Sequence, residues 1–136
     1  MAALTKGRNT PFRTGETRNF PVEAATTIFA GAMVAVNMSG YLEPIDGNTP
    51  SHVAVGRAES DVDNSAGAAG DLACEVRTGI FQYANSAAAD LIALADVGDV
   101  CFAADDQTVA KTDDLSARPN AGKIFDVDAN GVWVQF

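Results

Sequence analysis

The sequence is 136 residues long, a length typical of one domain that buries about two thirds of its unfolded surface. Its net charge of −9 argues against nucleic acid or an anionic membrane as the partner of the fold. No apolar run approaches the ~18 residues of a membrane span, and the start of the chain lacks the apolar core of a signal peptide.

Residues 1–18 are predicted to form an extended basic arm, followed by a single β domain over residues 19–136. The basic residues of the arm are Lys6, Arg8, Arg13 and Arg18, opposed by Glu16 alone, for a net charge of +3. The remaining five basic and 17 acidic side chains give the domain a charge of −12. Pro11 and Gly15 discourage regular structure in the arm.

The first half of the domain reads as short strands. A β-rich run covers residues 28–37 with a break at Gly31, and Ser39-Gly40 is expected to turn the chain into a strand at residues 41–43. A further strand is expected over residues 53–62. A flexible loop rich in Gly, Ala, Ser, Asn and Asp follows.

The middle of the chain contains its longest predicted strand, residues 72–83, in which Gly79 marks a candidate bulge. Residues 84–94 stay open between two interpretations. Three consecutive alanines favour a short helix, whereas the neighbouring strands favour a loop with one helical turn.

The C-terminal region contains two hairpin patterns. Residues 100–103 and 108–111 flank a polar turn, and residues 123–127 and 132–136 flank a second turn that contains Asn130-Gly131. Asn-Gly tolerates the positive φ angles that a tight hairpin needs. The last strand is apolar, so we expect it to be tied into a sheet or an interface.

Seven or eight short strands with a turn pattern every 8–12 residues indicate an all-β fold. We expect a jelly-roll-like sandwich or a small barrel. The apolar residues are mostly Ala and Val, which predicts a thin core and further burial at an interface.

Trp133 and Phe136 lie on opposite faces of the last strand. One is expected in the core, and the other is a candidate anchor for self-association.

Candidate chemistry is sparse. Asp126 to Gly131 matches the opening of a calcium loop, but its flanks are strands and the closing glutamate is missing, so we predict a hairpin turn. Paired carboxylates at residues 105–106 and 113–114, and alternating ones at 59, 61 and 63, are interpreted as solvated. His52 is interpreted as a surface histidine, and Cys74 and Cys101 as buried, reduced thiols. We expect no catalysis, no metal and no cofactor.

The order and spacing of several strand-and-turn segments resemble tailed-bacteriophage capsid decoration (cement) proteins. The segments are residues 29–36, 40–42, 53–58, 95–98, 101–109, 121–124 and 127–134. The resemblance implies a viral structural protein, made in the bacterial cytoplasm, that binds the outer surface of an assembled icosahedral head. Its partners would be the major capsid protein shell and other copies of itself, as a dimer or trimer on local symmetry axes. It would cement neighbouring capsomers against DNA pressure.

The arm then has two interpretations: a solubilising tail, or a strap that orders on an acidic patch of capsid protein. The strap would use Arg8, Arg13 and Arg18 for charge pairing and Phe12 as an apolar plug. A different class of function, a small-ligand or carbohydrate-binding β-barrel, stays open as the alternative, although ten aromatic residues spread along the chain give it little support.

Overall fold

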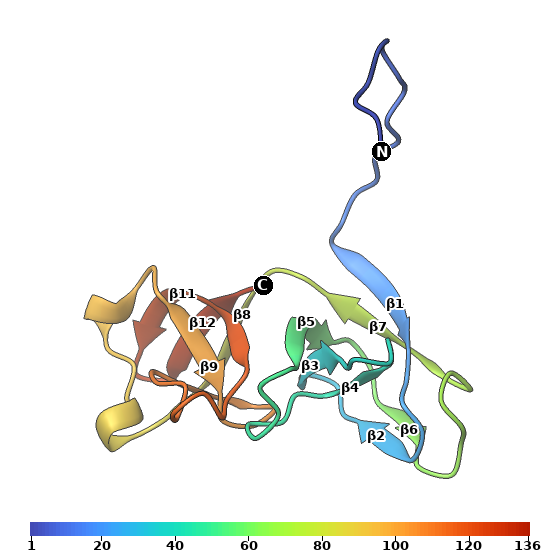
Figure 1. The fold of residues 1–136 in the computed structure, drawn as a ribbon. Helices are drawn as coiled ribbons and strands as arrows, with labels where there is room; N and C mark the ends of the chain where they lie inside the picture. The colour runs from blue at the N-terminus through green and yellow to red at the C-terminus, as the bar shows by residue number, and fades with distance from the viewer.

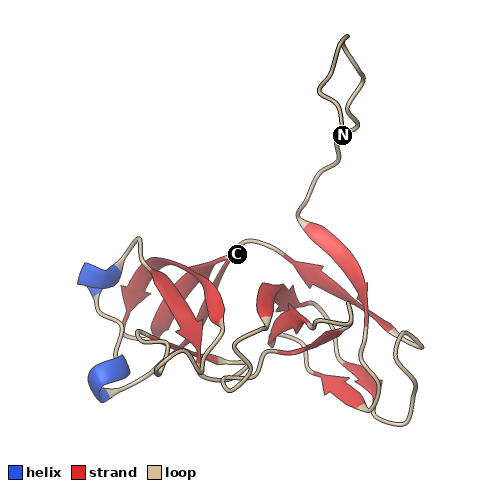
Figure 2. Ribbon diagram, in the orientation of Figure 1, coloured by secondary structure: helices blue, strands red, loops and turns tan.

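The computed structural model describes all 136 residues and is built almost entirely from strands (Figure 2). The strands are β1 (Thr17–Pro21), β2 (Thr26–Ile28), β3 (Met33–Val36), β4 (Leu42–Pro44), β5 (Val53–Ala58), β6 (Val62–Asn64), β7 (Ala73–Arg77), β8 (Ile80–Asn85), β9 (Val100–Ala103), β10 (Thr108–Ala110), β11 (Asn120–Asp128) and β12 (Gly131–Gln135). Two single-turn 3₁₀ helices, η1 (Ala88–Asp90) and η2 (Leu94–Asp96), complete the fold. The expected all-β fold is confirmed.

The N-terminal half forms an open antiparallel sheet in the order β1-β7-β5-β3-β4, accompanied by a ribbon of β2 and β6 (Figure 1). Side chains from the sheet and the ribbon share one core. Its buried members are Val22, Ile28, Ala32, Val34, Leu42, Ala58, Val62, Cys74 and Val76. The core is small and dominated by Val and Ala, as the composition predicts.

The C-terminal half closes into a five-stranded barrel in the order β10-β8-β12-β11-β9. Both predicted C-terminal hairpins are present, as the antiparallel pairs β9–β10 and β11–β12. The interior of the barrel is filled by side chains: Tyr83, Ile92, Cys101, Ala103, Val109, Ala121, Ile124, Val132 and Val134, joined by Met33, Ala35 and Ile45 from the other half.

Strand β3 joins the two halves because it is buried on both faces. Met33 and Ala35 point into the barrel core, whereas Val34 points into the core of the open sheet. The Met33 N–H donates to the carbonyl of Asp106 in the β9–β10 turn, at 2.7 Å. The guanidinium of Arg57 lies 4.2 Å from the centroid of the Phe81 ring. The barrel and the open sheet therefore share a packed junction.

The predicted continuous strand over residues 72–83 is wrong. Strand β7 ends at Arg77 and β8 begins at Ile80, in the other half of the molecule. Gly79 between them has φ of +152°, a conformation that side chains with a Cβ rarely adopt. Two strands of different sheets thus follow one another with a two-residue connection. The ambiguous stretch after them holds η1 and η2 instead of a regular helix.

Cys74 and Cys101 are both free and buried, as predicted. They belong to different cores, Cys74 to that of the open sheet and Cys101 to that of the barrel. Burial raises the pKa of the Cys101 thiol to about 11 and raises that of Cys74 as well. Both thiols therefore stay protonated and unreactive near neutral pH.

Candidate functional site

The N-terminal arm has almost no contact with the rest of the protein. Residues 1–16 form no strand or helix and are all exposed, and Figure 1 shows them projecting away from the body. Phe12 keeps 96% of its surface exposed. The contacts begin at Gly15 and Glu16, whose carbonyls accept hydrogen bonds from Thr78. An exposed aromatic ring on a free segment has nothing in this chain to pack against.

The charges of the arm are also without partners. Lys6, Arg8 and Arg13 make no ion pair with any carboxylate of the chain. Four of the five basic residues of the body do form such pairs, namely Arg57, Arg77, Lys111 and Arg118. The arm therefore presents an apolar side chain and several fully hydrated cations together.

The sequence places Arg18 in the arm, whereas the structure places it in β1. Its guanidinium donates to the carbonyl of Val55 at 3.4 Å and lies 5.0 Å from the centroid of the Phe20 ring. The sheet starts at Thr17, two residues before the predicted boundary. Arg18 is thus fixed on the body, where it stands at the root of the arm.

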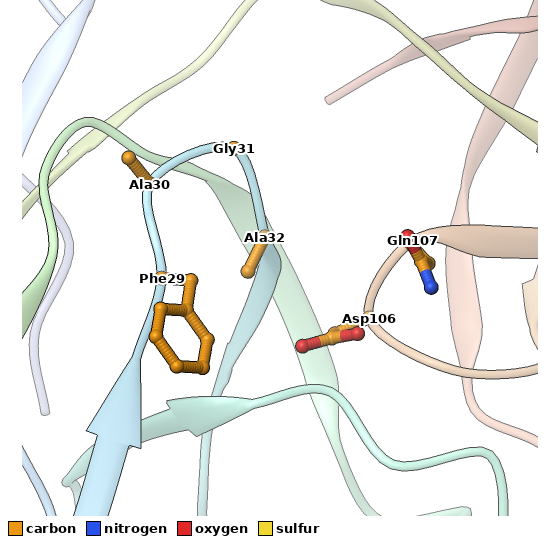
Figure 3. Close-up of a pocket in the computed structure, with 6 residues that line it drawn as sticks. All are labelled: Phe29, Ala30, Gly31, Ala32, Asp106 and Gln107. Carbon is orange, nitrogen blue, oxygen red and sulfur yellow. The ribbon is translucent and has the colours of Figure 1, made fainter.

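A shallow pocket of about 380 Å³ opens where the β2–β3 connection faces the β9–β10 turn (Figure 3). Phe29 and Asp106 point toward one another across it, and Gly31 and Ala32 form its wall. Phe29 is 63% exposed. Partial burial raises the pKa of the Asp106 carboxyl, and the neighbouring charge of Asp105 raises it further. An aromatic face beside a carboxylate with no cation is suited to receive a guanidinium or ammonium group.

A second pocket of about 330 Å³ lies over His52 and includes Arg118 and Asn120. The interpretation of His52 as a surface histidine is wrong, since its side chain is only 4% exposed. Its Nδ1 accepts the N–H of Asp46 at 3.2 Å, and its Nε2 lies 2.5 Å from Oε1 of Glu43. Both ring nitrogens are therefore occupied, and the imidazole ties β4 to the loop that follows it instead of offering a free base.

The alternating carboxylates identified from the sequence, at residues 59, 61 and 63, all contact groups of this chain. Glu59 pairs with Arg57 at 2.7 Å and with Arg77 at 3.4 Å, and these contacts, led by the Arg57 hydrogen bond, lower its pKa. Asp61 accepts the N–H of Ala30, and Asp63 accepts from Thr27 and Ser65. No cluster of three potential metal ligands occurs.

The turns that carry the other carboxylates are closed by their own hydrogen bonds. Asp105 caps the N–H of Gln107, and Asp113 accepts from Ser116. Asp128 accepts the N–H of Asn130, which closes the predicted β11–β12 hairpin turn. The calcium-like pattern from Asp126 to Gly131 therefore forms a tight turn between two strands.

Trp133 and Phe136 lie on opposite sides of the barrel wall, as predicted. Phe136 packs against the core, with its ring centroid 6.4 Å from that of Phe81 and 6.0 Å from that of Tyr83. Trp133 lies on the outside, where its Nε1–H donates to Asp128 at 2.9 Å. Phe136 is thus the core residue, and Trp133 is the outward residue, partly exposed to solvent.

Comparison of the chain with family models, with curated proteins and with solved structures finds no match. Neither of the two short 3₁₀ helices could serve as a membrane-spanning segment. The pocket of Phe29 and Asp106 was not anticipated from sequence. Its two key residues are 77 positions apart and meet only because the β9–β10 turn docks on β3.

Proposed function

We propose that this protein is a non-catalytic structural protein of a bacteriophage virion, which binds the outer surface of an assembled icosahedral head and cements neighbouring capsomers. The single observation that carries the proposal is the free N-terminal arm. An arm with a fully exposed aromatic ring and unpaired cations, attached to a strongly acidic body, is suited to bind outside its own chain.

The resemblance of residues 29–134 to phage cement proteins supplies the identity of that partner, the shell of major capsid protein. Arg8 and Arg13 would pair with carboxylates of the shell, and Phe12 would occupy an apolar recess. Arg18 would hold the root of the strap against the body. Ordering about a dozen residues costs entropy, so these contacts must exceed that cost. A shell offers the same weak binding site many times, and the copies bound at these sites stabilise the assembled shell by mass action.

The pocket of Phe29 and Asp106 gives the body its own contact with a basic side chain of the shell. Such a contact would lie at the junction of the two halves, whereas the arm would bind the shell from the N-terminal end of β1. Two attachment points on one copy can bridge two capsomers, and the second attachment gains from the raised local concentration that the first provides.

The alternative, a ligand-binding barrel, has no supporting observation. The barrel interior is occupied by the side chains of its own core, and the two pockets lie outside it. The cement proposal is therefore the one to test first.

The test is co-sedimentation with expanded, DNA-free phage heads that lack their own decoration protein. We expect the full chain to bind in a salt-sensitive manner. Phe12→Ala and the double change Arg8→Gln with Arg13→Gln should each weaken binding at least about tenfold. Leu4→Ala, which alters another exposed apolar residue of the arm, is the matched control. If a chain lacking residues 2–14 binds as tightly as the full chain, the arm is a tail and the strap is refuted.

A further inference from the structure

The outer surface of the barrel carries two outward aromatic side chains, Trp133, which is partly exposed, and Phe125, which is exposed. This surface, termed here the barrel face, is formed by outward side chains of β8, β12 and β11, namely Ile80, Gln82, Lys123, Phe125, Asp126 and Trp133. The register places Trp133 between Gln82 on one neighbouring strand and Asp126 on the other. Phe125 sits at a bulge in β11 and is 54% exposed.

Trp133 is held in a fixed orientation before any partner arrives. Its Nε1–H donates to Oδ2 of Asp128 at 2.9 Å, and Nε2 of Gln82 donates to the same carboxylate at 3.1 Å and 3.3 Å. These hydrogen bonds, led by that from Trp133, lower the pKa of Asp128, so the carboxylate stays charged and keeps its acceptors. A preorganised tryptophan loses little entropy on binding, and tryptophan is enriched among the residues that dominate interface energies.

Lys123 is the one basic residue after Arg18 without a carboxylate partner in the chain. Asp126, three positions further along β11, is similarly free, since its carboxylate accepts only the N–H of the adjacent Val127. Both side chains are exposed. The barrel face thus carries a free positive charge at Lys123 and a free negative charge at Asp126, beside Trp133 and the Asp128 carboxylate that neutral donors hold.

We propose that the barrel face binds the barrel face of a second copy across a two-fold axis. In such an isologous contact the two copies use the same surface. Lys123 of each copy faces Asp126 of the other, and the two Trp133 rings meet near the two-fold axis. The charges favour a second copy as the occupant, because one barrel face supplies both the lysine and the aspartate of the ion pair. The contact leaves the pocket of Phe29 and Asp106, and the arm, free for other partners.

The size of the face sets the strength of the contact. Three strands contribute few residues compared with the ~20–30 per side of a standard interface. The pairing is therefore weak in dilute solution and gains where copies are crowded, as on a decorated shell. The inference rests on the proposed function, because self-association is what the resemblance to cement proteins implies. Its test uses the protein alone, so its outcome and that of head binding are separate.

The experiment is sedimentation equilibrium of the full chain over a wide concentration range, together with the emission of Trp133, the single tryptophan. We expect a monomer–dimer equilibrium and a concentration-dependent emission shift. Trp133→Ala should raise the dimer dissociation constant at least about tenfold. Lys123→Glu and Asp126→Lys should each weaken the dimer, and the chain with both changes should regain much of the lost affinity. Lys6→Glu, a cation in the arm, is the control with no expected effect.

Thermal melts of each variant separate loss of pairing from loss of folding, since all the altered side chains lie on the outside of the barrel. A full chain that remains monomeric at the highest concentration overturns the proposal and leaves the face to another partner. A dimer that survives Trp133→Ala overturns it as well. So does a double charge reversal that is weaker than both single changes.

Discussion

The two ends of this chain differ in almost every physical respect. The first 16 residues are exposed, basic and without regular structure, and they touch the body only where β1 begins. The last strand, β12, is paired with β11 on one side and β8 on the other, and Val132 and Val134 are completely buried. One terminus lies free of the body, and the other completes the barrel. Each end can be altered to test this contrast.

Removal of residues 133–136 should have the largest effect. The truncation deletes Val134 and Phe136 from the barrel core and breaks the hydrogen bonds of β12 with two neighbours. Each buried side chain contributes about 1.5–3 kcal/mol, and each strand hydrogen bond about 1 kcal/mol. The sum approaches the ~5–15 kcal/mol of a whole domain. We expect an unfolded or aggregated product by circular dichroism, and a soluble protein with an unchanged melt would contradict the role given to β12.

A methyl group at the start of β12 should be the next most damaging change. Gly131 has φ of +148°, and a Cβ there would lie 2.3 Å from the carbonyl oxygen of Tyr83. Gly131→Ala is expected to cost about 3 kcal/mol or more, since strain and a backbone clash add. Gly40 also has positive φ but has open space around it, so Gly40→Ala should cost about 1 kcal/mol. Urea unfolding of both variants measures the difference, and equal losses would contradict the clash.

Tyr83→Phe should stabilise the protein slightly. The hydroxyl of Tyr83 is buried beneath the end of β12 and has no hydrogen-bond partner, and this burial raises its pKa. Removing an unsatisfied buried hydroxyl should add about 1 kcal/mol to the free energy of unfolding. Tyr41→Phe, in a less buried position, is the matched control and should change little. A loss of stability in Tyr83→Phe would mean that the hydroxyl has a partner.

Deletion of residues 2–14 should have the smallest effect on folding, because none of them makes a hydrogen bond or ion pair with the body. We expect the free energy of unfolding to stay within about 0.5 kcal/mol of that of the full chain. The same deletion is expected to abolish most binding to phage heads. A lower melting temperature together with unchanged binding would reverse the roles assigned to the two ends.

Local patterns in the sequence were sufficient for the elements that depend on neighbouring residues. Both C-terminal hairpins could be predicted because their turns and flanking strands lie within about a dozen residues of one another. The opposite orientations of Trp133 and Phe136 follow from alternation along one strand. The extended arm follows from its charge and its lack of apolar periodicity. Each of these features is determined by the backbone and side chains of a short segment.

The tertiary structure decided what each segment meets. Residues 72–83 alternate like one strand, yet Gly79 directs the second half into the barrel, because the hydrogen-bonding partners of β8 are β10 and β12. His52 is buried because Glu43 and the N–H of Asp46 satisfy both ring nitrogens, and no local pattern specifies that pairing. Likewise, Asp106 faces Phe29 only because the β9–β10 turn docks on β3. Whether a carboxylate lies beside Lys123 also depends on which strands pack together. Local propensity and alternation are short-range properties, whereas burial and charge pairing depend on which distant strands pack together.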